Sequence, residues 1–219
     1  MTRRMQRDER ERQIIVGAIA FFAEHGFSGQ TRALASSLGV TQPLLYAYFS
    51  SKQALIDRLY QELFVERWSD DWPRQISDQS MPLRARLISV YAEFSERILS
   101  RDWVRMFVHA GLDNQPYLAR VLARIQATIL RPIAAELRRA NGYPMVPPSR
   151  LRAAEVEHVW NLHGSVFYFH LRLHVYGLQL TTTTAAMIDG VVDNLLAGAP
   201  GALGRILGPP PASAHRCVC

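Results

Sequence analysis

Cysteine is nearly absent from this chain of 219 residues, which carries only Cys217 and Cys219 at its C-terminal end. A disulfide between residues this close in sequence closes almost no loop, so disulfides do not hold the fold together. Lysine is rarer still, because Lys52 stands alone beside 24 arginines. With 48% hydrophobic and 20% charged residues, the composition is that of a soluble globular chain and excludes a collagen, a coiled-coil rod or a disordered protein.

Long hydrophobic runs are also missing. Eight of the first twelve residues are charged, which is too many for a secretory signal peptide. The apolar run from Ile14 to Ala23 is far shorter than the ~20 residues that a membrane-spanning helix needs. We therefore expect a cytoplasmic protein with no membrane partner.

Positive charge is denser toward the N-terminal end. The first 60 residues hold 8 basic and 5 acidic side chains, a net of +3, and the remaining 159 hold 17 and 14, again +3. This sign permits a polyanionic partner such as nucleic acid, although net charge alone does not identify one.

Apolar residues recur at helical spacing in every long segment, and no segment alternates with the period of two that is typical of strands. Pro132 interrupts one of these segments, so we expect a kink or a break near Arg131. The pattern predicts an all-α fold, with helices near residues 14–25, 31–38, 42–49, 52–68, 83–98, 103–110, 117–139, 151–176 and 181–196.

Local signals mark the short helices near the N-terminal end. Gly39 supplies the positive φ of a sharp turn, Thr41 suits an N-cap, and Pro43 fits the first helical turn. Ser50 and Gln53 have the spacing of a capping box for the next helix. Two short helices joined at Gly39 and preceded by a longer one describe a helix-turn-helix, although spacing alone also fits an ordinary hairpin of two helices.

The run from Thr31 to Leu55, TRALASSLGVTQPLLYAYFSSKQAL, carries a specific resemblance. With it, residues 10–60 resemble the TetR family of one-component repressors. The resemblance implies an N-terminal three-helix DNA-binding domain followed by a helical bundle that binds a small effector and dimerises. Tyr48 replaces the family's usual recognition-helix histidine, and Gln30 replaces its usual Thr or Ser, so the operator sequence stays open.

The resemblance also implies a set of DNA-contacting residues, and the chemistry of their side chains agrees. Arg32 has a planar fork that fits guanine, Gln42 can bridge the N6 and N7 atoms of adenine, and Pro43 offers apolar contact to the thymine methyl. The remaining members carry hydroxyls or an ammonium that suit phosphate oxygens: Thr31, Thr41, Tyr46, Tyr48 and Lys52.

We expect a DNA-binding domain at 1–51, a connecting helix at 52–68, an effector-binding and dimerisation domain at 69–200, and a disordered tail at 201–219. The preferred function is a ligand-responsive transcriptional repressor that binds a palindromic double-stranded DNA operator as a homodimer. Apolar stripes on the last two helices predict the dimer interface. They comprise Val159, Leu162, Val166, Phe169, Leu173, Ile188, Val192 and Leu195.

Large rings with a few polar tips gather in the C-terminal half, as they do in pockets between helices. Each ring taken alone also fits a role in the core. Because the resembled family binds its effectors inside such a bundle, we expect a cavity between the Pro132 and Trp160 helices for a flat, apolar or aromatic ligand. The candidates for effector binding are Trp103, Phe107, His109, Trp160, His163, Phe167 and His170.

A helical enzyme or metal-binding bundle without DNA binding is the alternative. Glu155 and His158 have the Glu-x-x-His spacing of di-metal bundles, but that site needs the motif twice and the chain has it once. No nucleophile motif or phosphate-binding loop is present, so we expect no enzyme, no cofactor and no metal. Weaker metal candidates are His163, His170 and His174 on one helix face, and His215, Cys217 and Cys219 in the tail.

Overall fold

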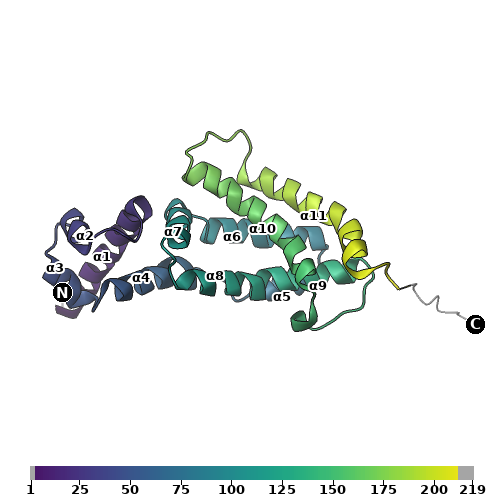
Figure 1. Cartoon of the computed structure of the whole chain (residues 1–219), viewed down its shortest axis with the longest axis horizontal. Helices are drawn as coiled ribbons and strands as arrows, with labels where there is room; N and C mark the ends of the chain where they lie inside the picture. The colour runs from purple at the N-terminus through teal and green to yellow at the C-terminus, as the bar shows by residue number, and fades with distance from the viewer. Residues whose placement is uncertain (1–2, 212–219) are drawn as a thin grey trace, which may run out of the picture. The chain divides into compact units, whose positions relative to one another are not determined.

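The computed structural model describes residues 3–211, and every regular segment among them is helical, which confirms the predicted all-α fold (Figure 1). The elements are α1 (Arg3–His25), α2 (Thr31–Ser37), α3 (Gln42–Tyr48), α4 (Lys52–Tyr60), the π-helical turn η1 (Gln61–Val65), α5 (Trp72–Ser77), α6 (Leu83–Arg97), α7 (Arg101–Leu112), α8 (Tyr117–Ile125), the π-helical turn η2 (Gln126–Leu130), α9 (Arg131–Ala140), the 3₁₀ turn η3 (Pro148–Arg150), α10 (Ala153–His174) and α11 (Thr184–Leu207).

The chain forms two compact units whose segments interleave in sequence. Of the described residues, the first unit contains 3–68 together with Arg97–Val121 and His170–Gly177, and the second contains Ser69–Glu96, Leu122–Phe169 and 178–211. The first segment of the first unit ends at Trp68, the last residue of the expected connecting helix. A contiguous domain over 69–200 is not what the structure forms, because α7 packs against α1 in the first unit.

The turn signals at the N-terminal end are confirmed, with one correction. Gly39 has φ +63°, and Thr41 Oγ1 accepts a hydrogen bond from the Leu44 N–H at 3.3 Å. The predicted capping box is wrong, because the N-cap of α4 is Ser51, whose Oγ accepts from the Ala54 N–H at 3.0 Å. Gln53 lies one position too early to reach back to this cap, and its amide donates to Asp57 instead.

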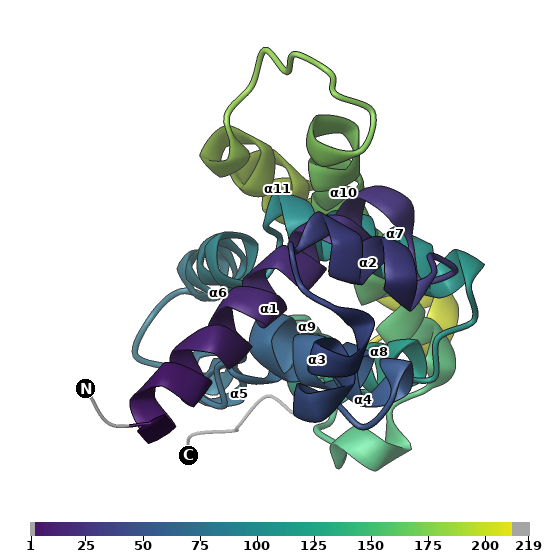
Figure 2. The ribbon, with the colours of Figure 1, turned by 90° about the vertical axis from the view of Figure 1, so that its left-hand side faces the viewer.

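The first unit is organised around the inward face of α1, which contacts α2, α4 and α7 (Figure 2). Ile14, Ile15, Ala18 and Phe22 on this face are at most 3% exposed. They share the core with buried residues of the following three helices, including Leu34, Leu45, Leu55 and Leu59. This packing fixes α2 and α3 as a helix-turn-helix rather than a free hairpin.

Two π-helical turns, η1 and η2, interrupt the α-helical geometry. A kink or a break was expected near Arg131; the structure has a change of helix type there, because the π-helical turn η2 ends directly before α9. The turn η1 was not predicted, because its apolar spacing continues that of α4. The short helix α5 was not predicted either. Pro73 occupies its first turn, and Trp72 and Ile76 are fully buried.

The disordered tail was expected to begin at residue 201, but residues 201–207 are helical. α11 continues to Leu207 through Pro200, because Ala199, Ala202 and Leu203 are buried and offset the loss of one helical hydrogen bond at the proline. The tail residues His215, Cys217 and Cys219 lie outside the described residues. Within the described part of the chain, none of the helices is long and apolar enough to cross a membrane.

Candidate functional site

A surface groove lies where α2 and α3 begin. It brings together five of the eight residues that the sequence predicts to contact DNA, although α2, α3 and the start of α4 are separated by turns. The lining residues are Ser28, Gly29, Gln30, Thr31, Arg32, Gln42, Tyr46 and Lys52.

Hydrogen bonds preorganise this groove around Thr31. The Gln42 Nε2 amide donates to Thr31 Oγ1 at 2.9 Å, and the Tyr46 hydroxyl lies 3.2 Å from the same oxygen. These contacts hold the first residues of α2 against one face of α3. Arg32, the next residue of α2, is exposed and carries its guanidinium at the edge of the groove.

Lys52 has a structural contact that sequence reasoning did not anticipate. Its Nζ donates to the Gly29 carbonyl at 2.8 Å, which ties the start of α4 to the loop before α2. The side chain is half-buried, so its ammonium both fixes the groove and stays at its rim.

The other three predicted contact residues lie outside the groove. Thr41 and Pro43 are exposed in the first turn of α3, where Thr41 is engaged as the N-cap. Tyr48, the last residue of α3, is half-buried, and the Arg7 guanidinium carbon lies 5.7 Å above its ring centroid.

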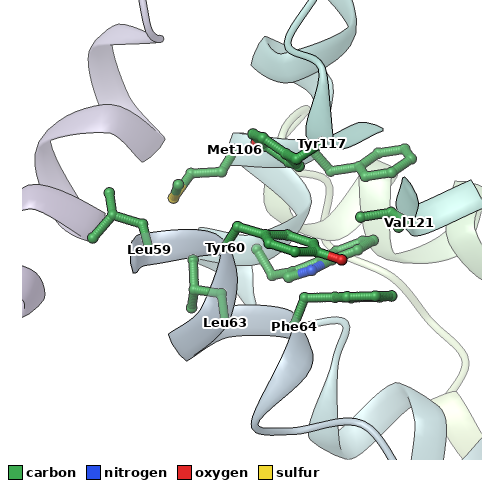
Figure 3. A pocket seen from close by; sticks show the side chains of 9 residues that line it. Leu59, Tyr60, Leu63, Phe64, Met106, Tyr117 and Val121 are labelled. Atoms are coloured by element: carbon green, nitrogen blue, oxygen red, sulfur yellow. The ribbon is translucent and has the colours of Figure 1, made fainter. Parts of the chain in front are cut away.

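A small apolar cavity lies elsewhere in the first unit, bounded by α4, η1, α7 and the start of α8 (Figure 3). Its free volume is ≈ 20 Å³, about the space of one water molecule. The lining residues are Leu59, Tyr60, Leu63, Phe64, Trp103, Met106, Phe107, Tyr117 and Val121.

The walls of this cavity are stacked rings. Trp103 and Phe107 lie one turn apart on α7, with centroids 4.8 Å apart and planes 17° apart. Phe64 of η1 also stacks on Trp103, with ring centroids 6.3 Å apart and planes 23° apart. Burial, assisted by Asp113, raises the pKa of Tyr117 above its usual value, so that hydroxyl stays protonated and able to donate a hydrogen bond.

Of the seven predicted effector residues, Trp103 and Phe107 line this cavity and the other five do not. His109 packs against the backbone of Gly26, where an added Cβ would lie 2.8 Å from His109 Nδ1. Trp160 and His163 meet edge to face at 5.4 Å in the second unit, which also contains Phe167. His170 lies beside His174, with ring centroids 5.6 Å apart.

His163 is packed as a neutral core residue. It is 6% exposed, and its ring centroid lies 5.2 Å from that of Phe94 and 6.0 Å from that of Tyr91. Burial lowers the pKa of His163 to about 4, so the imidazole is uncharged at neutral pH. Among the described residues, no group of three or more His, Cys, Asp or Glu side chains is placed to hold a metal ion.

Residues 14–59 match the family model described as bacterial regulatory proteins, tetR family. The tetracycline repressor protein class A from transposon 1721 of Escherichia coli is 37% identical to this chain over 100 residues, and the class G protein of Vibrio anguillarum is 34% identical over 100 residues. The N-terminal part of the chain is therefore similar to the DNA-binding domain of TetR-family proteins. Each alignment covers 45% of this chain and 44% or 45% of the relative, so the chain matches less than half the length of these repressors.

Solved TetR-family structures share the fold over most of this chain. A regulator from Pseudomonas syringae pv. tomato DC3000 is 17% identical and covers 89% of this chain and 96% of its own, with a TM-score of 0.59. A regulator from Streptomyces coelicolor is 20% identical and covers 90% of this chain and 83% of its own, with a TM-score of 0.58. At these identities the likeness concerns the fold.

The contacts that join α7 to α1 could not be predicted from the sequence. Arg105 Nε donates to the Ala23 carbonyl at 2.8 Å, and Asp113 Oδ2 accepts from the Phe27 N–H at 2.8 Å. Both pairs satisfy backbone groups at the end of α1 that its own helix leaves unpaired. No sequence signal identifies these partners, because more than 80 residues separate them.

Proposed function

We propose that this protein is a ligand-responsive transcriptional repressor that binds a palindromic DNA operator as a homodimer. The observation that carries the proposal is the groove at the start of α2 and α3. There Arg32 and Gln42, whose side chains suit base edges, lie beside Thr31, Tyr46 and Lys52, whose groups suit phosphates.

The geometry separates contacts that read bases from contacts that position the protein. Gln42 is the first residue of α3, the end of a recognition helix that reaches base edges in the major groove. Its amide is held by Thr31 in the free protein, so the side chain enters the groove of DNA with little conformational entropy to lose. The exposed ring of Pro43 faces solvent next to it and suits a thymine methyl.

Selection from a pool of random DNA duplexes tests this proposal. We expect the protein to enrich an inverted repeat whose half-sites lie about 34–36 Å apart, or a multiple of that distance, because one recognition helix reads only a few base pairs. Recovery of the pool without any enriched sequence would show that the groove is not a sequence-reading surface.

The homodimer is proposed on the outward faces of α10 and α11. All members of the predicted stripe except Leu173 are at most 5% exposed within one chain, so they have little surface left to offer a second copy. The outward faces of α10 and α11 instead carry small and polar residues, and a groove between the two helices runs along them. Leu162 and Leu195 nevertheless line the groove on the proposed face. Small side chains there allow the helices of two copies to approach closely. This face includes Asn161, Gly164, Ser165, Gly190 and Asn194.

We place the effector site at the apolar cavity of the first unit. Its free volume of ≈ 20 Å³ is well below the roughly 300–1,000 Å³ of ligand pockets, so a ligand must push the lining helices apart. The walls favour a neutral, flat, apolar or aromatic ligand, with the Tyr60 and Tyr117 hydroxyls as polar contacts.

Opening this cavity would reach the DNA-binding groove by two routes. The first is the helix that contributes Leu59 to the cavity and Lys52 to the groove. The second is α7, which contributes Phe107 to the cavity and holds the end of α1 through Arg105. A coupling free energy of about 1–3 kcal/mol between the two sites is enough to release an operator.

Replacing Phe107 with alanine is expected to blunt effector release and to spare DNA binding. Losing a stacked ring from the cavity wall should raise by about tenfold the concentration of a neutral aromatic compound that half-releases the enriched duplex. Phe167→Ala is the matched control, because Phe167 is a half-buried ring that does not line the cavity. If Phe167→Ala raised this concentration and Phe107→Ala did not, the effector would bind in the second unit, as the sequence predicts.

A further inference from the structure

Arg7 extends the surface around α3 beyond the groove. The guanidinium of this α1 residue lies 5.7 Å from the ring centroid of Tyr48, the last residue of α3. Arg7 is exposed, and its guanidinium lies over the face of the Tyr48 ring. Stacking on an aromatic ring orients the planar fork at little entropic cost.

The charge of Arg7 is not neutralised by a neighbouring acid. Among residues 7–211, no carboxylate oxygen lies within 4.0 Å of Arg7 or of Arg10, one turn further along α1. Of the three acids close to Arg7 in sequence, Asp8, Glu9 and Glu11, Glu9 pairs with Arg12 at 3.2 Å. The first turns of α1 therefore bring a cation without a salt bridge to the end of the recognition helix.

The position of Tyr48 decides which part of DNA this cation would meet. Tyr46 and Tyr48 are two residues apart, which on an α-helix places them about 200° apart around its axis. A helix in the major groove has a phosphate backbone on each side. Tyr46 belongs to the groove with Lys52, so Tyr48 and Arg7 belong to the opposite side of α3.

We propose that Arg7, whose guanidinium lies over the Tyr48 ring, binds a phosphate of the DNA backbone on the side of the major groove opposite to Lys52. This inference rests on the proposed DNA-binding function. It makes the N-terminal end of α1 part of the DNA-binding surface, and it gives the Tyr48 ring the role of a platform for Arg7. A guanidinium held in this way can bind a phosphate through two parallel hydrogen bonds.

The salt dependence of binding tests the proposal. The dissociation constant for the enriched duplex is measured by fluorescence anisotropy between 50 and 200 mM salt. Each phosphate neutralised by a cation contributes about 0.9 to the slope of log affinity against log salt. We expect Arg7→Gln to lower that slope by about 0.9 and to weaken binding to enriched and scrambled duplexes by the same factor.

Further variants distinguish the contribution of the Tyr48 ring from that of the Arg7 charge. Arg12→Gln should keep the wild-type slope, because that guanidinium is paired with Glu9. Tyr48→Phe should also keep it, since the ring is retained, whereas Tyr48→Leu should lower it as Arg7→Gln does. Arg7→Lys should restore the slope.

Failure of this inference is distinguishable from failure of the proposed function. If the wild-type protein binds the enriched and scrambled duplexes equally, the sequence-reading function is wrong. If the wild type discriminates between them but Arg7→Gln keeps the wild-type slope, the function stands and the role of Arg7 is overturned.

Discussion

Glu136→Leu is expected to lower the free energy of unfolding by about 3–5 kcal/mol, because it leaves a buried arginine without its carboxylate. Glu136 of α9 and Arg86 of α6 are 5% and 3% exposed, and their Oε2 and Nη1 atoms lie 2.8 Å apart. Arg86 would retain the Ile76 carbonyl as an acceptor, which does not neutralise its charge.

Replacing the arginine of this pair, in Arg86→Met, is expected to lower the free energy of unfolding by less than Glu136→Leu does. Burial by itself raises the pKa of Glu136, but hydrogen bonds from Arg139, Gln79 and Arg86 outweigh it, so the pKa lies below its usual value. In Arg86→Met the carboxylate would keep Gln79 at 2.7 Å and Arg139 at 2.9 Å. That variant should lose less stability than Glu136→Leu.

Urea unfolding at pH 7 checks both expectations. The double variant Arg86→Met, Glu136→Leu should recover most of the loss, because two apolar side chains replace both charges. Glu96→Leu, at an exposed position of α6, is the control and should change stability by less than about 0.5 kcal/mol. A loss for Glu136→Leu no larger than that of the control would contradict the importance of this ion pair.

The DNA-binding part of the fold could be predicted because its signals are local. Gly39, Thr41 and Pro43 each act within one turn of the chain, and the structure confirms all three. The capping box shows the limit of such signals, since Ser50 and Ser51 both fit the cap and only the backbone geometry selects Ser51.

The candidate effector site could be predicted only in part, because it depends on packing between distant segments. Trp103 and Phe107 are one turn apart on α7, and the structure stacks them in the cavity wall. Trp160 has the same ring chemistry but belongs to the second unit, and helical spacing does not tell the two locations apart. The π-helical turn η1 is likewise invisible in the sequence, because it adds one residue to a helical turn without changing the residue types.

Gln42→Ala is expected to cost about 1–3 kcal/mol of binding free energy toward the enriched duplex, because its amide would lose a bidentate contact to one base. The loss should be confined to duplexes that carry the preferred base, and binding to scrambled DNA should be unchanged. Gln53→Ala is the matched control, since Gln53 is exposed on α4 and its amide donates to Asp57, away from the groove.

The central claim, that the groove at the start of α2 and α3 reads DNA sequence, is tested most directly by the base preferences of Gln42→Ala. Duplexes carrying each single-base change of the enriched repeat are titrated with wild type and variant. The account predicts that the variant loses discrimination at one position of each half-site and keeps it at the others. A variant with the wild-type preference at every position would contradict the claim.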